Sequence, residues 1–319
     1  MSVGSVSNAG RFWLIWVVVA PLAAWAATRL LGLDGATPIA FLFAFTPHVA
    51  VAALLLTVVA VALRNWAASA VAALAGAVLV AAVLPRAVGG AEAPPRGSER
   101  LEVLSANIYR GHADPRALLA LVERHDPDLL ALQELTPGFD RRLRAAGMRR
   151  LLPHSTLPPG PLIPGENGVY SRLPLRALPD HPSWAILTMP GGRSIRVVNV
   201  HTHVPSPRAA DRWRSGLGLL PSAGSGAPWV LLGDFNATLD HDALREVLSR
   251  GYRDAADVTG EGLVPTWPVG RPFPPQVTID HVLADSRLGV AGFGADDLAG
   301  SDHRAVHASL FLPPAGNAQ

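Results

Sequence analysis

Two short polar motifs stand at the ends of apolar, strand-like runs. Residues 229 to 236, Trp-Val-Leu-Leu-Gly-Asp-Phe-Asn, lead straight into Asp234 and Asn236. These two side chains would share one face if the strand continued through them, because side chains alternate along a strand. Ser301-Asp302-His303 stands directly before a second strand-like run, 305 to 312. Carboxylate, amide and imidazole groups converging at one sheet edge suit a cation and a phosphate.

Other polar side chains also lie at or near the ends of apolar runs, where they can gather above a sheet. Carboxylates in that arrangement repel one another unless a cation neutralises them, and hard oxygen ligands select Mg²⁺ or Mn²⁺. An Asp-His combination adds an acid or base for hydrolysis. The candidates are Asn107, Glu134, Asp234, Asn236, Asp280, Asp302 and His303.

Each motif taken alone also fits a structural role. Asp and Asn after a strand commonly form turns, so a turn explains Gly-Asp-Phe-Asn alone about as well as catalysis does. The buried strand before the motif favours catalysis. An acid at a strand end, such as Glu134, is usually just solvated. Ser301-Asp302-His303 could be a helix cap or a loop cluster, but its pairing with Ile279-Asp280-His281 favours a site.

Two histidines, His201 and His203, follow another strand-like run. Both would lie on one face, so either could reach a phosphate. We expect His201 to do so, because Val-Asn-Val precedes it directly. The pair could also bind zinc, yet no third ligand is evident nearby. We expect surface or packing roles for His112, His125, His154, His241 and His281.

The elements that must position these residues read as an alternation of strands and helices. Residues 101 to 108 predict a strand, Asp114-Pro115 begins a helix, Asp126-Pro127 ends it, and 128 to 132 return to a buried strand. A strand, a helix and a strand in succession imply a parallel or mixed sheet covered by helices. A second helix is predicted at 242 to 249, and irregular loops at 153 to 164 and 268 to 275. Further strands are predicted at 168 to 171, 195 to 201, 229 to 235, 278 to 283 and 306 to 311.

The first 87 residues have a different character. The runs 12 to 28, 36 to 63 and 66 to 85 are apolar and each is long enough, or nearly so, to span a membrane. A cleaved signal peptide would explain the first run but not the other two. The sequence therefore predicts a membrane domain of three transmembrane helices over residues 1 to 87. His48 in the second run could serve as a proton relay or satisfy backbone beside Pro47.

The arginines that flank the three runs bear on the orientation of this membrane domain. Arg11 and Arg64 would lie on one side and Arg29 and Arg86 on the other, so the counts tie. An amino terminus inside the cell would place the region after Arg86 outside the cytoplasm, and that is the arrangement we expect for this integral membrane protein.

Composition separates the membrane region from the rest of the chain. Residues 88 to 100 combine Gly, Pro and charge and are predicted to be a linker, with one sizeable domain at 101 to 313 and a tail at 314 to 319 after it. That domain carries 21 Arg against 22 Asp plus Glu, a net charge of −1, which does not favour strong non-specific binding of nucleic acid. There is no lysine, and no cysteine to form disulfides or thiolate metal sites.

The polar motifs carry a family resemblance when they are taken in order. They are Asn107, Leu-Gln-Glu at 132 to 134, Ser-Arg-Leu-Pro-Leu at 171 to 175, Asn-Val-His at 199 to 201, Gly-Asp-Phe-Asn at 233 to 236, Ile-Asp-His at 279 to 281 and Ser-Asp-His at 301 to 303. This order resembles the endonuclease/exonuclease/phosphatase family over about 101 to 313. The resemblance implies an α/β fold, a four-layer sandwich of two packed mixed sheets with helices outside.

The resemblance also implies roles for the candidates in water attack on a phosphate ester. Glu134 would be the chief ligand of Mg²⁺ or Mn²⁺, with Asn107 and Asp302 close to the metal or its waters. Asp234 would orient or deprotonate the water, and Asn236 would hold a phosphoryl oxygen. His303 would contact the phosphate, with its tautomer fixed by Asp280, and His201 would act as phosphate ligand or general acid.

These expectations combine into a membrane-anchored, metal-dependent phosphoesterase. Its substrate could be nucleic acid, an inositol phosphate or another soluble phosphate ester, or a lipid headgroup, and no obligate protein partner is evident. The main alternative is a catalytically inactive membrane interaction protein with the same fold. A transporter with an appended domain is a weaker alternative.

Overall fold

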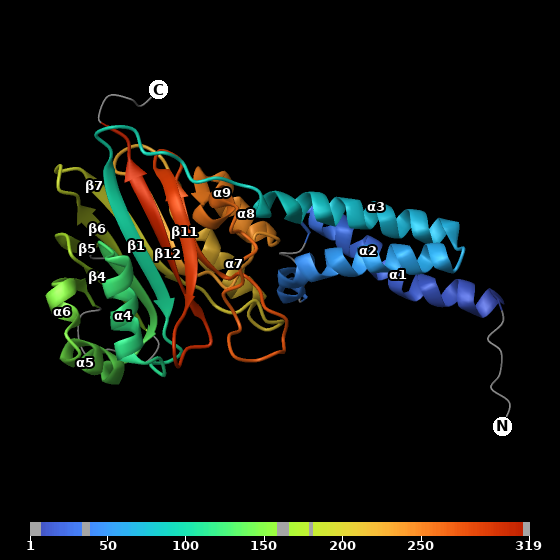
Figure 1. Cartoon of the computed structure of the whole chain (residues 1–319), viewed down its shortest axis with the longest axis horizontal. Coiled ribbons are helices and arrows are strands. Elements are labelled where there is room, and N and C mark those ends of the chain that lie inside the picture. The colour runs from blue at the N-terminus through green and yellow to red at the C-terminus, as the bar shows by residue number, and fades with distance from the viewer. Residues whose placement is uncertain (1–7, 34–38, 158–165, 179–180, 315–319) are drawn as a thin grey trace.

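The computed structural model describes residues 8–33, 39–157, 166–178 and 181–314, and its centre is a pair of six-stranded sheets packed face to face (Figure 1). The first sheet has the order β11-β12-β1-β2-β4-β3 and the second the order β5-β6-β7-β8-β10-β9. Both sheets are mixed, because β1 and β2 pair in parallel, as do β7 and β8, while the other neighbours pair antiparallel. The strands of the first sheet are β1 (Glu99–Asn107), β2 (Leu129–Leu135), β3 (His154–Thr156), β4 (Glu166–Ser171), β11 (Gly289–Asp297) and β12 (Arg304–Leu312). Those of the second are β5 (Leu175–Leu178), β6 (His181–Thr188), β7 (Ser194–His201), β8 (Trp229–Asp234), β9 (Tyr252–Asp254) and β10 (Asp280–Asp285).

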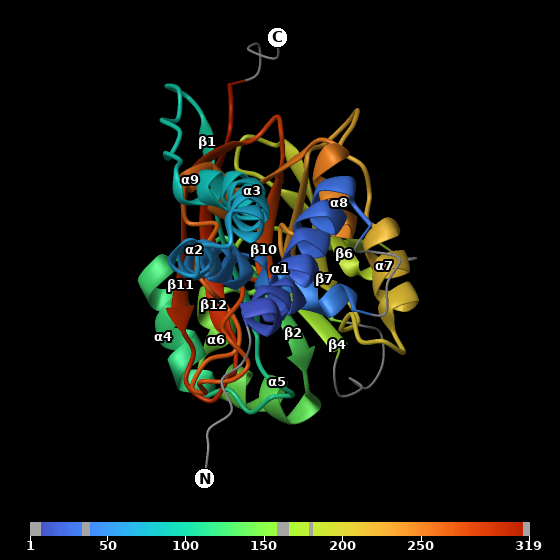
Figure 2. The same ribbon diagram turned by 90° about the vertical axis from the view of Figure 1, so that its right-hand side faces the viewer.

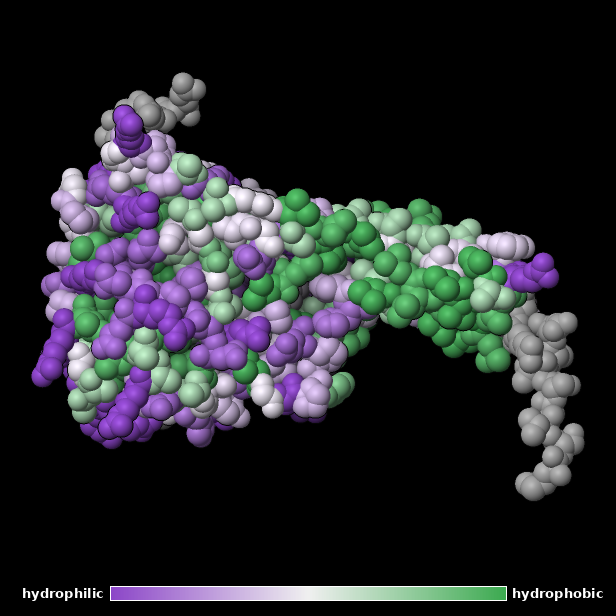
Figure 3. All heavy atoms as spheres, viewed as in Figure 1, coloured by the Kyte–Doolittle hydropathy of each residue, from purple (hydrophilic) through white to green (hydrophobic). Residues whose placement is uncertain are grey.

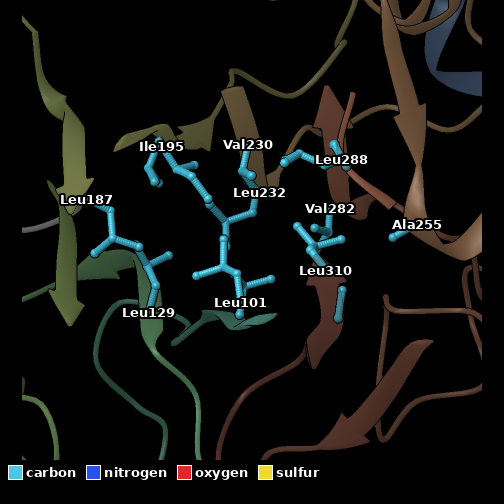
Figure 4. Close-up of a cluster of buried hydrophobic side chains, with 14 of the residues drawn as sticks. Leu101, Leu129, Leu187, Ile195, Val230, Leu232, Ala255, Val282, Leu288 and Leu310 are labelled. Atoms are coloured by element: carbon cyan, nitrogen blue, oxygen red, sulfur yellow. The ribbon is translucent and has the colours of Figure 1, made fainter. Parts of the chain in front are cut away.

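The core between the sheets results from alternation along the strands. Every second residue of β1, β7, β8 and β10 faces the opposing sheet, for example Leu101 on β1 and Val230 and Leu232 on β8 (Figure 4). These side chains are at most 2% exposed, so each contributes on the order of 1.5–3 kcal/mol of burial.

Helices cover the outer faces of the two sheets and complete the predicted four layers. The outer face of the first sheet packs against α4 (Pro115–His125), α5 (Pro137–Ala145) and α6 (Met148–Leu151). That of the second packs against α7 (Ala210–Gly218) and α8 (Asp242–Ser249). Figure 2 shows α4 on one side of the molecule and α7 and α8 on the opposite side. A short helix, α9 (Ala255–Thr259), comes directly after β9.

Three apolar helices project from one side of this sandwich (Figure 1). They are α1 (Asn8–Leu31), α2 (Thr46–Ala62) and α3 (Trp66–Val83), with the short 3-10 helices η2 (Ala40–Phe45) before α2 and η3 (Leu84–Ala87) after α3. Figure 3 shows their surface as a largely hydrophobic belt beside a mixed, more polar surface on the sandwich. The candidate spans are Trp13–Leu31, Ala40–Ala62 and Trp66–Ala87, which are long and apolar enough to cross a membrane.

The helices are joined to the sandwich by a buried ion cluster. Asp240, fully buried, accepts hydrogen bonds from Arg86 (2.6 and 2.8 Å) and from Arg29 (3.0 Å). Burial alone would raise the pKa of Asp240, but the hydrogen bonds and charges of Arg86 and then Arg29 outweigh it and lower the pKa. Next to it, Nε2 of His241 lies 3.0 Å from the carbonyl oxygen of Ala40 in η2. We call Arg29, Arg86 and Asp240 the arginine clasp.

The predicted linker runs along the surface of the sandwich. Residues 88 to 98 have no helix or strand, yet Glu92 pairs with Arg253 and its amide donates to the carbonyl oxygen of Val290. Charge at position 92 therefore holds the segment against β9 and β11.

Several elements differ from the prediction. The loop expected at 153 to 164 contains β3, and its residues 158 to 164 lie outside the described residues, as do residues 315 to 319 of the predicted tail. The strands β5, β6, β9 and β11 were not predicted, because they are short or interrupted by Pro182 and by three glycines in β11 that blur the alternation. The helix at 242 to 249 is confirmed as α8.

Candidate active site

Three adjacent strands of the second sheet bring polar side chains into one row. In the ladder of β7, β8 and β10, His201 pairs in register with Asp234, and Asp234 with Asp280. All three continue the inward-facing alternation of their strands, so they form the polar end of the core between the sheets. Gly233 permits the close approach of β8 to β7, since a Cβ there would lie 2.0 Å from the carbonyl oxygen of Val200.

The first sheet contributes Asn107 and Glu134 from the opposite side. Asn107 ends β1 on its inward-facing alternation, in register with Gln133 of β2. Glu134 would face outward by the same alternation, but its φ of +59° and a register shift in the pairing of β2 with β4 turn the chain there. A left-handed residue of this kind is strained unless its surroundings hold it.

Asn236 corrects one expectation. The strand ends at Asp234, so alternation does not place Asp234 and Asn236 on one face. Asn236 instead has a φ of +47°, and its backbone N–H donates to Oδ1 of Asp234 at 2.8 Å. Its side chain donates to the carbonyl oxygen of Thr202 at 3.0 Å. Asn236 therefore forms a turn, and this turn holds Asp234 in place. We call the row of His201, Asp234 and Asp280, with the polar side chains beside it, the polar edge.

One side chain bridges the two sheets. Nδ2 of Asn107 donates to Oδ2 of Asp234 at 3.0 Å and to Oε1 of Glu134 at 3.3 Å. Nε2 of His201 lies 3.8 Å from the Glu134 carboxylate and 3.9 Å from that of Asp234. These four predicted residues therefore meet at one edge of the sandwich.

His303 and Asp280 form a buried pair beside this group. Nδ1 of His303 lies 2.9 Å from Oδ2 of Asp280, while Nε2 points between Asp234 Oδ2 (3.8 Å) and Asp302 Oδ1 (3.9 Å). Burial would lower the pKa of His303, but the charges of Asp280 and Asp234 outweigh it and raise the pKa to about 9. Burial raises the pKa of Asp234, against the opposing charges of His303 and His201. A cationic imidazole thus adjoins a carboxylate with a strengthened affinity for protons.

The oxygens of Asp302 and Glu134 fit a divalent cation. Oδ1 of Asp302 is buried and has no hydrogen-bond partner among the described residues, whereas Oδ2 accepts from Trp267 (3.2 Å) and Arg271 (3.0 Å). Carboxylate oxygens with free lone pairs are the donors that Mg²⁺ and Mn²⁺ prefer. Asp234, Asp280 and His303 also lie close enough together to hold an ion, within 4.8 Å of one another. In that group Oδ2 of Asp280 is engaged by Nδ1 of His303, whereas Oδ1 of Asp302 has no hydrogen-bond partner among the described residues.

A layer of buried polar side chains inside the core supports the candidate site from below. Nε2 of Gln133 donates to Ser105 (3.0 Å) and to Oδ1 of Asn199 (2.7 Å), and Asn199 donates to two backbone carbonyls, those of Leu132 and Gly168. This layer ties β1, β2, β4 and β7 together directly beneath the candidate site. Only the alternation of polar residues toward the strand ends hints at it in the sequence.

The other histidines differ in their surroundings. The strand β7 ends at His201, so alternation does not extend to His203, which is exposed two residues beyond the strand. His281 is buried, with Nδ1 2.6 Å from Asp254 and Nε2 2.9 Å from the carbonyl oxygen of Ala237. His241 is also buried, and His154 is exposed.

Three further residues at this edge carry no signal in the sequence. The amide of Arg110 donates to Oε2 of Glu134 at 2.8 Å, and the Arg110 side chain is 80% exposed. Arg271 packs over the ring of Trp267 at 5.3 Å while it contacts Asp302. Both arginines bring positive charge to the mouth of the site, where a phosphate would arrive.

The fold is an α/β sandwich of two packed mixed sheets, with polar side chains gathered at one edge. The model of the Endonuclease/Exonuclease/phosphatase family matches residues 104–303, and the chain belongs to that family. Members of this family are phosphoester hydrolases and generally use divalent metals. The matched range includes all eight candidate residues, from Asn107 to His303.

Solved structures give the same fold. An endonuclease/exonuclease/phosphatase from Beutenbergia cavernae is 21% identical with a TM-score of 0.53, covering 69% of this chain and 73% of that one. A humanized D. rerio TDP2 is 16% identical with a TM-score of 0.53, covering 66% and 98%. D. rerio TDP2 complexed with a single-strand DNA product is 17% identical with a TM-score of 0.50 and the same coverage. No significant match is found among curated proteins.

Proposed function

We propose that this protein is a membrane-anchored, divalent-metal-dependent phosphoesterase that cleaves a phosphodiester or phosphomonoester with an activated water. In this proposal residues 1–87 anchor the chain through three transmembrane helices, 88–100 connect, and 101–313 carry catalysis outside the cytoplasm. The observation that carries it is the position of His303 Nε2, held by the bond of Nδ1 to Asp280. It lies between Asp234 and Asp302 Oδ1, an oxygen with no hydrogen-bond partner among the described residues.

In this proposal separate residues bind the metal, activate the water and bind the phosphate. Glu134, Asn107 and Asp302 would hold Mg²⁺ or Mn²⁺, which would supply positive charge beside the phosphate. Asp234, whose pKa is raised by burial, would orient the water and accept its proton. His303, kept cationic by Asp280, would bind a phosphoryl oxygen and stabilise the charge that develops there. Asn236 would hold a second phosphoryl oxygen, and His201 would contact the phosphate or protonate the leaving group.

The test measures turnover of bis(p-nitrophenyl) phosphate by the full-length protein in detergent. We expect Mg²⁺ or Mn²⁺ to support turnover and EDTA to abolish it. Glu134→Ala and Asp234→Ala should each lower turnover on the order of 100-fold or more. Glu123→Gln, at an exposed position on α4, is the matched control and should leave turnover unchanged.

Two outcomes would contradict this proposal. Unchanged turnover in both alanine variants would remove these residues from the mechanism. Mn²⁺ binding in calorimetry, combined with no hydrolysis across a broad phosphoester panel, would favour the inactive membrane interaction protein. The sidedness is tested separately, by labelling residues of the sandwich with a membrane-impermeant reagent in intact cells and in inverted vesicles.

A further inference from the structure

The candidate site opens into a cavity that is built from both parts of the chain. This cavity, of about 810 Å³, reaches from Glu134, His201, Asp234 and His303 to Phe41, Leu42 and Phe45 of η2. One part of its lining is therefore polar and belongs to the candidate site, and another part, the apolar wall, is formed by η2 within the candidate span Ala40–Ala62. An apolar wall of this kind suits hydrocarbon, which a phospholipid carries and a small ester such as glycerophosphocholine lacks.

The depth of η2 can be inferred from the length of α2. Its 17 residues span about 25 Å at the helical rise, whereas the hydrocarbon core of a bilayer is about 30 Å thick. The apolar span continues through η2, for 23 residues from Ala40 to Ala62. With the charged Arg64, just beyond the other end of α2, at one boundary of the hydrocarbon, η2 and the cavity wall that it forms would lie at the opposite boundary.

The rim of the cavity carries apolar side chains that face outward. Phe273 is 79% exposed, Val204 is 60% exposed and Phe41 is 37% exposed, and all three line the cavity. Large exposed apolar side chains gathered beside a membrane span are typical of a surface that meets lipid. The exposed Arg110 in the same cavity adds a charge that suits anionic headgroups.

The apolar wall is fixed relative to the catalytic residues. His241 contacts the carbonyl oxygen of Ala40 in η2, and Asp240 binds Arg29 and Arg86 in the arginine clasp. Both residues come a few positions after Asn236, the proposed phosphate holder. The distance from the phosphate position to the membrane boundary is thereby set by buried contacts.

We propose that the substrate is a membrane lipid with a phosphoester headgroup, its phosphate at the polar edge and its hydrocarbon chain against η2. This inference rests on the proposed function and specifies its substrate. Hydrolysis breaks one P–O bond: water supplies the hydroxyl that phosphorus gains and the proton that the leaving oxygen takes. The lipid reaches the site from the side, without leaving the bilayer completely.

The experiment compares substrates that share a phosphodiester and differ in their chains. The full-length protein is assayed on mixed phosphatidylcholine and phosphatidylglycerol vesicles, on glycerophosphocholine and glycerophosphoglycerol, on single-stranded DNA, and on bis(p-nitrophenyl) phosphate. We expect hydrolysis of at least one vesicle lipid at more than about tenfold the rate of its chain-free counterpart, since burial of even part of one chain favours binding by that much.

Variants of the apolar wall give a second readout. Phe41→Ser and Phe273→Ser should lower the ratio of lipid to bis(p-nitrophenyl) phosphate turnover about tenfold. Leu219→Ser is the matched control: Leu219 is also 79% exposed but does not line this cavity, and its ratio should not change.

Equal rates on a lipid and its chain-free counterpart, or a preference for DNA, would overturn the lipid inference. Turnover of bis(p-nitrophenyl) phosphate in that case leaves the proposed function standing. Hydrolysis of none of these phosphodiesters would overturn the lipid inference, and with it the phosphodiesterase form of the proposed function.

Discussion

Asp280 and His303 face each other across 2.9 Å in the interior of the polar edge, and each is almost completely buried. They come from the antiparallel strand β10 and from the residue before β12, so the pair joins the second sheet to the first. This contact fixes which nitrogen of His303 faces Asp234 and Asp302.

Changing Asp280 to Asn tests this pair. The amide keeps the shape of the side chain but removes the charge that holds His303 cationic. We expect kcat to fall by about 10- to 100-fold, the usual loss when an outer partner of a catalytic group is removed, with little change in metal affinity. Steady-state kinetics and Mn²⁺ calorimetry measure the two effects. An unchanged kcat would mean that His303 does not depend on Asp280.

Metal affinity distinguishes the two possible ion sites. If Glu134 and Asp302 hold the cation, Glu134→Gln and Asp302→Asn should each weaken Mn²⁺ binding by at least about tenfold, because even outer partners of metal ligands cost that much. If the ion instead lies among Asp234, Asp280 and His303, Asp280→Asn should weaken binding more than Asp302→Asn does. Calorimetry on the three variants decides between the two sites.

His281 predicts a pH-dependent stability. Burial would lower its pKa, but the charge and hydrogen bond of Asp254 outweigh it and raise the pKa above the usual 6.5. A raised pKa means that the stabilisation is complete below about pH 6.5 and is lost as the pH rises through the pKa of the folded state.

The measurement is the melting temperature in detergent between pH 6 and pH 9. His281→Gln should lower it at pH 6 and reduce its decline toward pH 9, relative to the unchanged protein. His154→Gln, an exposed control, should match the unchanged protein at every pH. A parallel decline in the His281 variant would refute the role of this histidine.

The arginine clasp predicts a large loss of stability when its anion is removed. Asp240→Asn leaves Arg29 and Arg86 buried without a counter-charge, which costs about 3–5 kcal/mol of the free energy of unfolding. Thermal unfolding in detergent measures it. The double variant Asp240→Leu with Arg86→Met should recover part of the loss, because fewer buried charges then remain unpaired. A loss below about 1 kcal/mol in Asp240→Asn would show that water or headgroups already solvate the cluster.

The sequence predicts this site well where chemistry coincides with strand ends. Asn107, Asp234 and Asp280 can be placed by alternation, since each continues the buried face of its strand. The position of Glu134 could not be derived in that way, because a left-handed backbone turns it against the alternation. Alternation does not place Asn236 either, because β8 ends at Asp234 and Asn236 lies in a turn with a φ of +47°.

Other features exist only in three dimensions. The apolar wall of the cavity joins η2 to a catalytic edge that begins more than sixty residues later in the sequence, and nothing in the composition of residues 40–45 separates a cavity wall from any other apolar segment. The arginine clasp is similar, since Arg29 and Asp240 are 211 residues apart. The three-span prediction places Arg29 and Arg86 on the same side of the membrane. In the structure both arginines bind the carboxylate of Asp240.

The in-register row of His201, Asp234 and Asp280 has a consequence for how such a protein can diversify. A one-residue insertion within β7, β8 or β10 would exchange an inward polar group for its outward neighbour, so these strands tolerate no change in length. Loops such as 268–275 and the short helix η2 touch the same cavity without belonging to the ladder. Relatives could therefore acquire new substrates by altering these borders while the ladder preserves the same reaction.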